Sequence, residues 1–156
     1  MARSEDIRTG NEVVELSTFY IGEALCGMDI LKVQEINKLL EMTKVPQAPE
    51  YVKGILNLRG QIVTVIDLGK KLGLSETQIS HETRNIIVNS RNEYIGFLVD
   101  RIGDVERTEW GSVEPPPANI DGVQGKYFEG VFKTEKSLIG ILNVEEVLKE
   151  QEVLGQ

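Results

Sequence analysis

Two blocks of this chain occur twice in the same order, and this internal repeat limits the possible folds more than any other feature. At a shift of 76 positions, residues 51–55 align with 127–131. At a shift of 69 positions, residues 27–36 align with 96–105. Because the apolar positions match in both blocks, the sequence predicts two similar structural units. The unequal shifts predict an insertion in the second copy, near 115–125, where Pro and Gly are dense.

The strands expected from local patterning are short. Runs rich in Val, Ile, Thr and aromatic residues lie between turn residues, which is typical of strands. The predicted strands span residues 13–21, 25–30, 62–66, 85–88, 94–99, 127–132 and 138–143. The run at 62–66 is uncharged, which predicts burial on both faces, and Gly60 before it can adopt the positive φ of a tight turn.

Helices are expected to be few and brief. Apolar residues three apart predict a single helical turn at 31–36, and the pattern repeats at 100–105. A proline can open a short helix at 49–53. Residues 67–74, which a glycine closes, predict another short helical turn, and apolar spacing predicts a helix at 144–154.

Short strands, regular turns and few helices indicate a mainly β protein built from two small β-barrels. Each unit would hold about seventy residues and would be marginally stable alone, so we expect the two to pack together. The expected organisation is a flexible N-terminal arm at 1–12, one unit at about 13–74, a polar linker at 75–84, a second unit at about 85–143, and a C-terminal helix and tail at 144–156.

The chain lacks the sets of side chains that catalysis and metal binding usually need. His81 is the single histidine and falls in the polar linker, while Cys26 is the single cysteine and is expected to be a small buried core residue. This pair cannot complete a structural zinc site. Asp67 and Asp100 are candidates for an acid–base pair or for caps of helical turns, and capping is the favoured interpretation. We therefore predict a protein that is not an enzyme and that holds no metal or cofactor.

Charge and hydropathy narrow the class of partner. The formal net charge of −8 argues against binding nucleic acid by neutralising its phosphates. A single cysteine excludes an internal disulfide and suits a reducing compartment. No run approaches the ~20 apolar residues of a membrane span, and the N-terminal residues are not followed by the apolar core of a signal peptide. The sequence predicts a cytoplasmic protein that binds other proteins.

One place distinguishes the two copies of the repeat. Residues 57–60, Asn-Leu-Arg-Gly, align with Lys-Thr-Glu-Lys at 133–136, although the flanking strands match in type. Arg59 is therefore the strongest candidate for a partner contact, with a solvated turn residue as the alternative. The near-equivalent apolar residues Ile30, Val33, Leu98 and Val99 either face the cores or line a groove for an apolar partner helix. For Trp110, partial burial is favoured over a role as an interface anchor.

Residues 51–68 (YVKGILNLRGQIVTVIDL) resemble the signature segment of CheW, the family of bacterial chemotaxis coupling proteins. Residues 28–36 and 96–100 resemble two further segments of that family, and the similarity extends over 13–148. The resemblance implies two SH3-like five-stranded β-barrels with short helices and a C-terminal helix, which agrees with the repeat. It also implies an adaptor or scaffold without catalytic activity, which joins chemoreceptor cytoplasmic tips to the regulatory domain of the histidine kinase CheA.

Positions that match the family's motifs carry its binding roles over to this chain. The resemblance implies receptor binding by Ile30, Val33, Arg59, Leu98 and Val99. It implies kinase binding by Glu35 and Lys53 on the first barrel. The dense Pro and Gly of 115–125 depart from the family's pattern, which leaves open any ring contact through the second barrel.

The resemblance also implies where such a protein works. It implies a cytoplasmic component of a two-component system, recruited to membrane-associated chemoreceptor arrays without direct membrane contact, monomeric in solution and oligomeric in arrays. One alternative is a CheW-like adaptor of a non-swimming chemosensory pathway that serves surface motility or gene regulation. Another is an enzyme on a small β-barrel scaffold, which would need acid–base groups clustered in a pocket.

Overall fold

The computed structural model describes residues 9–39 and 41–154, with side chains through 149. Most of the predicted N-terminal arm, residues 1–8, lies outside the described residues, as does the end of the predicted tail. The rest of that arm is ordered by backbone hydrogen bonds, because the amides of Trp110 and Gly111 donate to the carbonyls of Glu12 and Gly10 at 2.8 Å each.

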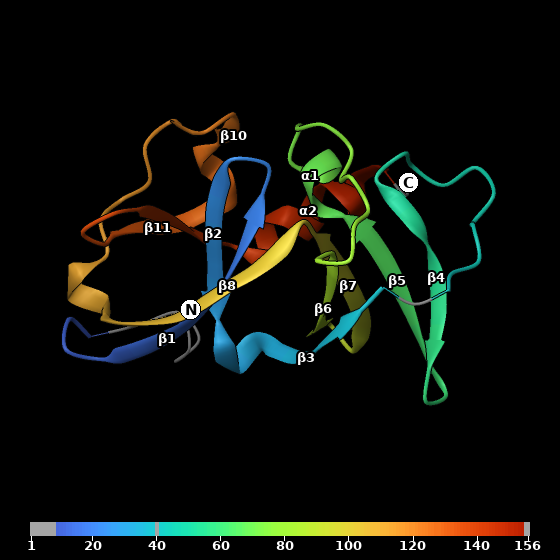
Figure 1. The fold of residues 1–156 in the computed structure, drawn as a ribbon, viewed down its shortest axis with the longest axis horizontal. Helices are drawn as coiled ribbons and strands as arrows, with labels where there is room; N and C mark the ends of the chain where they lie inside the picture. The colour runs from blue at the N-terminus through green and yellow to red at the C-terminus, as the bar shows by residue number, and fades with distance from the viewer. Residues whose placement is uncertain (1–8, 40, 155–156) are drawn as a thin grey trace.

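Two five-stranded sheets form the body of the protein and lie side by side in Figure 1. Sheet 1 has the order β11-β12-β2-β1-β8 and sheet 2 the order β3-β6-β7-β5-β4. The strands of sheet 1 are β1 (Val13–Ile21), β2 (Ala24–Asp29), β8 (Arg101–Glu109), β11 (Phe128–Lys133) and β12 (Leu138–Leu142). The strands of sheet 2 are β3 (Val33–Lys38), β4 (Val52–Leu58), β5 (Gln61–Asp67), β6 (Arg84–Ser90) and β7 (Glu93–Val99).

The remaining elements are short. The helices are α1 (Leu68–Lys71) and α2 (Val144–Leu154), and the 3-10 turns are η2 (Ile30–Lys32), η3 (Trp110–Ser112) and η4 (Gly125–Tyr127). A small ribbon of β9 (Asn119–Ile120) and β10 (Val123–Gln124) occupies the predicted insertion at 115–125. The mainly β class is therefore confirmed, together with few helices and a C-terminal helix.

The two sheets share one topology, which confirms the internal repeat. In sheet 1, β2 pairs antiparallel with β1 and parallel with β12. In sheet 2, β7 pairs antiparallel with β6 and parallel with β5. The strands that occupy equivalent places, such as β2 and β7 or β4 and β11, are those that the shifts of 69 and 76 align.

Each sheet takes strands from both copies of the repeat, so the predicted units at 13–74 and 85–143 do not coincide with the sheets. The first two strands of the first copy pair with the last three of the second copy, and the reverse holds in sheet 2. Only η2 separates β2 from β3, so the chain passes directly from one sheet to the other. The predicted linker at 75–84 instead connects α1 with β6 inside sheet 2.

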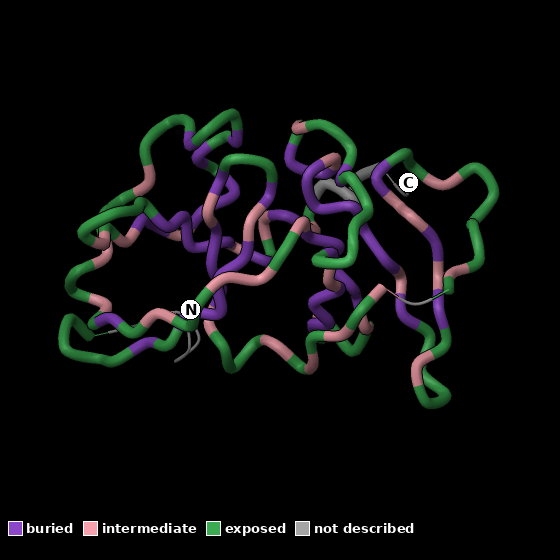
Figure 2. The backbone as a smooth tube through the Cα atoms, viewed as in Figure 1, coloured by how far each residue is buried: buried purple, intermediate pink, exposed green. Residues whose placement is uncertain are grey.

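The largest core joins the two sheets. It combines buried residues of β1 and β2 with those of β5, β6 and β7, and both helices contribute to it. The buried positions are purple in Figure 2. Cys26 lies in this core without exposed surface, as predicted, and burial raises the pKa of its thiol to about 12. Each sheet also has a smaller apolar cluster of its own. Trp110 packs partly buried against the cluster of sheet 1, which confirms its predicted partial burial.

The predicted closed barrels are open sheets. The strand order of each sheet runs from one edge strand to another without a closing ladder. Instead, a single bridge brings the chain after β3 back onto β4, where Thr43 and Ile55 exchange backbone hydrogen bonds of 2.8 Å. The equivalent bridge in sheet 1 joins Glu114 and Val131 with bonds of 2.9 and 2.8 Å.

Several predicted helical turns are wrong. Residues 31–36 contain only the end of η2 and then enter β3, whose half-buried and exposed residues alternate because it pairs with β6. Residues 100–105 lie mostly in β8, and 49–53 form a turn that leads into β4. The helix at 144–154 is confirmed, and so is the turn at 67–74, which contains α1.

The two aspartates that were expected to cap helical turns have different roles. The Asp67 carboxylate caps α1 by accepting a 3.2 Å hydrogen bond from the amide of Lys70, as predicted. Asp100 caps no helix in the described structure, because β8 follows it, and its Oδ2 accepts a 2.6 Å hydrogen bond from the amide of Gly22. The predicted burial of both faces of 62–66 also fails at its first residue, Ile62, which is 57% exposed.

Candidate functional site

The turn between β4 and β5 presents Arg59 at the tip of a hairpin. Both turn residues have positive φ, +52° at Arg59 and +85° at Gly60. A two-residue turn of this kind matches the twist of the paired strands. The amide of Gly60 donates a 2.8 Å hydrogen bond to Oδ1 of Asn57, which fixes the turn further. The sequence predicted the glycine's conformation but not that of Arg59, whose side chain is 71% exposed.

Arg59 forms an ion pair and hydrogen bond with Glu35 of β3. The other carboxylate oxygen of Glu35 accepts a 3.0 Å hydrogen bond from Nδ2 of Asn37. The hydrogen bond from Arg59 lowers the pKa of the Glu35 carboxyl, with a further contribution from Asn37, and the same contact raises the pKa of Arg59. Because β3 and β4 are opposite edges of sheet 2, this network of three side chains links the two edges.

The structure therefore brings together two residues to which different roles were assigned. Arg59 was predicted to contact the receptor and Glu35 the kinase, yet the two side chains touch. Lys53, the other predicted kinase contact, lies near the opposite end of β4. Its Nζ is 2.7 Å from Oε1 of Glu76 and lowers the pKa of that carboxyl. The predicted kinase contacts are thus separated along sheet 2.

The predicted apolar groove is only partly at the surface. Ile30 is 38% exposed on η2, and Val33 is half-buried at the start of β3. Leu98 and Val99 have no exposed surface, so the interpretation that they face the cores is correct for both. Adjacent residues of a strand point to opposite faces, and both faces of β7 are covered. In this structure neither side chain can line a groove.

Sequence reasoning missed the most exposed apolar side chain in this region. Leu31 on η2 is 86% exposed, next to Ile30. The missed signal is its position two residues after Asp29, whose Oδ1 accepts a 3.0 Å hydrogen bond from the Leu31 amide. Such a local cap favours a turn, and a turn between two sheets leaves its side chains at the surface. Ile30 and Leu31 together form a small exposed apolar surface where the chain passes from one sheet to the other.

The single histidine and the single cysteine of the chain lie in different surroundings. His81 is exposed in a turn, and Cys26 is buried with a raised pKa. No group of three or more His, Cys, Asp or Glu side chains in the described part of the chain could hold a metal ion. No described helix is long and apolar enough to cross a membrane.

Comparison with known proteins points to one family. The CheW-like domain profile matches residues 15–152. The chain is 32% identical over 155 residues to the chemotaxis protein CheW of Treponema pallidum, covering 97% of this chain and 91% of that protein. It is 33% identical over 138 residues to the chemotaxis protein CheW of Helicobacter pylori, covering 88% and 83%. The crystal structure of scaffolding protein TtCheW from Thermoanaerobacter tengcongensis matches with a TM-score of 0.80, 34% identity and 88% of each chain covered.

Proposed function

Because the chain belongs to the CheW-like domain family, we propose that it is a chemotaxis adaptor, a scaffold that couples chemoreceptors to the histidine kinase CheA. The observation that carries this proposal is the extent of the family match, which includes nearly every strand of both sheets. An adaptor needs a rigid body that can hold two partners at once, and two sheets that share a core supply it.

For the receptor we propose a binding surface formed by sheet 2 and by η2, the turn that joins sheet 2 to sheet 1. It consists of Ile30, Leu31 and Val33, with Arg59 at the tip of the β4–β5 hairpin. Exposed aliphatic residues suit the apolar stripe of a receptor helix, and a guanidinium adds orientation. Leu98 and Val99 support this surface from the cores and make no contact themselves.

For the kinase we propose contacts at Glu35 and Lys53. Glu35 already binds Arg59, so a partner that binds either side chain competes with this ion pair and alters how the other side chain is held. The two proposed partners therefore meet at this ion pair, which would couple their binding. Recruitment to membrane-associated arrays follows in this proposal from receptor binding, and weak contacts suffice there because many copies raise the effective concentration.

The test is to measure binding of the purified chain to a CheA regulatory domain and to a receptor cytoplasmic hairpin, singly and together, by calorimetry. Simultaneous binding to both is expected. Arg59→Glu should weaken receptor binding while circular dichroism stays unchanged. The matched control is Arg107→Glu, the same charge change at an exposed position of β8 in the other sheet. Failure of the folded wild-type chain to bind either partner would refute the adaptor function.

A further inference from the structure

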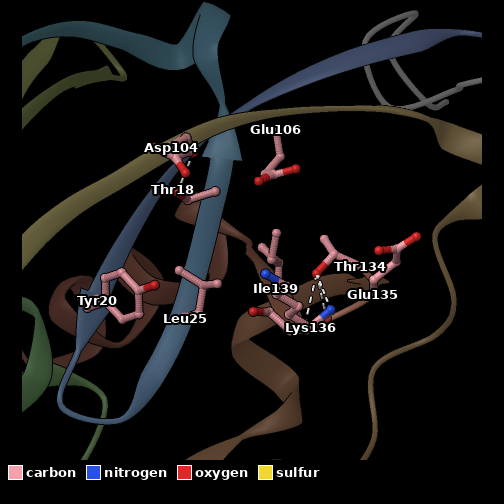
Figure 3. Close-up of a pocket in the computed structure, with 10 residues that line it drawn as sticks. Thr18, Tyr20, Leu25, Asp104, Glu106, Thr134, Glu135, Lys136 and Ile139 are labelled. Atoms are coloured by element: carbon pink, nitrogen blue, oxygen red, sulfur yellow. Dashed lines mark hydrogen bonds between the residues drawn. The ribbon is translucent and has the colours of Figure 1, made fainter.

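Sheet 1 carries an open cleft between its strands and the β11–β12 turn. Its volume is about 380 Å³, and Leu25 and Ile139 contribute apolar lining. Three carboxylates also line it, from Asp104 and Glu106 on β8 and from Glu135 on the turn. Figure 3 shows the two β8 residues on one side of the cleft and Glu135 on the other.

The internal repeat identifies what this cleft corresponds to in sheet 2. A shift of 69 aligns Asp104 with Glu35 and Glu106 with Asn37. A shift of 76 aligns Glu135 with Arg59. These are the positions of the network that links the two edges of sheet 2.

At equivalent positions, sheet 2 therefore has the arginine Arg59, whereas sheet 1 has the acid Glu135. In sheet 2 an arginine from the hairpin turn binds a carboxylate of the edge strand, and an amide of the same strand donates to that carboxylate. In sheet 1 all three equivalent side chains are acidic. No described residue forms a hydrogen bond or ion pair with the carboxylates of Asp104, Glu106 or Glu135.

The charges in the lining of the cleft indicate which kind of group suits it. Lys136 is the only basic residue in its lining, so the cleft carries excess negative charge. Neighbouring like charges are unfavourable, and an added cation relieves them. The described carboxylates do not converge closely enough to hold a metal ion. An extended cation fits better, because a guanidinium donates several hydrogen bonds in a plane and its aliphatic stem packs on apolar side chains.

We propose that this cleft, referred to as the acidic cleft, receives an arginine side chain from a partner protein. The guanidinium would bind Asp104, Glu106 and Glu135 as Arg59 binds Glu35 within the chain. The stem would lie on Leu25 and Ile139. This is a third contact surface, on the sheet opposite to the proposed receptor and kinase contacts.

The probe is N-acetyl-arginine amide, titrated into the isotope-labelled full chain and followed by NMR. Shifts should concentrate at 104–106 and 134–139, and they should weaken with added salt. N-acetyl-citrulline amide, which has nearly the same shape without the charge, should produce no such shifts. Asp104→Asn, Glu106→Gln and Glu135→Gln should each weaken binding about tenfold or less, and together by more.

Glu135→Arg provides an independent test, since it restores the cation that sheet 2 has. The new arginine should pair with the β8 carboxylates, abolish binding of the arginine probe and raise the melting temperature. Glu93→Arg is the control, because it makes the same charge change at an exposed position of sheet 2. Equal shifts with the citrulline compound, shifts elsewhere on the chain, or unchanged binding in Glu135→Arg would each overturn the proposal. Neither a receptor nor a kinase enters these measurements, so their outcome is independent of the adaptor function.

Discussion

Replacing Gly54 by alanine should destabilise the fold, because the chain after β3 comes very close to this residue. A Cβ built at Gly54 would lie 2.6 Å from the carbonyl oxygen of Thr43 and 3.2 Å from Cβ of Met42. The backbone must move to make room, and the two hydrogen bonds between Thr43 and Ile55 are the contacts at risk. The repeat places a glycine at the equivalent position in sheet 1, Gly130, where a Cβ would lie 2.8 Å from the carbonyl oxygen of Glu114.

The expected loss in the free energy of unfolding of Gly54→Ala follows from two limiting cases. If the bridge holds, overpacking costs about 1–3 kcal/mol. If the bridge opens, two backbone hydrogen bonds are lost, at about 0.5–1.5 kcal/mol each. Both limits lead to about 2 kcal/mol, which lowers the melting temperature of a chain of this size by about 4–8 °C.

Urea unfolding followed by circular dichroism measures the change in free energy of unfolding for Gly54→Ala and Gly130→Ala. Gly10→Ala is the control, since a Cβ there would have its nearest neighbour at 3.8 Å, an ordinary contact. The first two variants should lose similar stability and the control very little. If Gly54→Ala unfolds at the same urea concentration as the wild type, the bridge does not constrain β4 and this explanation of the glycine is wrong.

Three further predictions follow from burial and charge. Arg59→Gln should raise the pKa of Glu35 towards its ordinary range, as measured by NMR titration. Because the ion pair lowers this pKa in the folded chain, it stabilises the fold at pH values above the ordinary carboxyl pKa. This stabilisation disappears as the pH falls through the lowered pKa. An unshifted titration would show that the pair is not formed in solution. Cys26 should resist thiol reagents until urea unfolds the chain, because it is fully buried; rapid labelling of the native protein would contradict this. Leu98→Ala should cost about 2–5 kcal/mol of stability, and a loss of receptor binding without loss of stability would place this residue at the surface after all.

Patterns local to a strand or a turn were sufficient for much of the fold. The alternation and β-branching at 13–21 and 138–143 predicted β1 and β12 closely. The repeat predicted two equivalent sheets, because equivalent strands bury equivalent apolar residues. The repeat does not show which strands pair with one another, because the equivalent strands of the two copies offer the same apolar face. In the structure only the three residues of η2 separate β2 from β3, so the chain passes directly to the other sheet, whereas the sequence predicted a helical turn at 31–36.

The candidate site was predicted in its components but not in its contacts. Arg59 was expected beside the tight turn at Gly60, and it lies at the tip of the β4–β5 hairpin. Its contact with Glu35 depends on how sheet 2 curves, which brings residues 24 positions apart together. Leu98 and Val99 were assigned to the groove by their match to the family's motifs, and their burial depends on the two clusters that cover β7. The acids of the acidic cleft were passed over because Asp104 and Glu106 are ordinary on a polar strand face and Glu135 is ordinary in a turn.

The exchange of strands between the two copies has a consequence for how the protein is made. Pairing of β1 with β8 joins residues such as Val13 and Glu109, so sheet 1 cannot form until most of the chain has left the ribosome. At about 5–20 residues per second, the β1–β2 hairpin waits several seconds for its partners. Contacts so distant along the chain also slow folding once synthesis ends. The early hairpin is exposed during that interval, which makes a nascent chain of this fold a natural client for ribosome-associated chaperones.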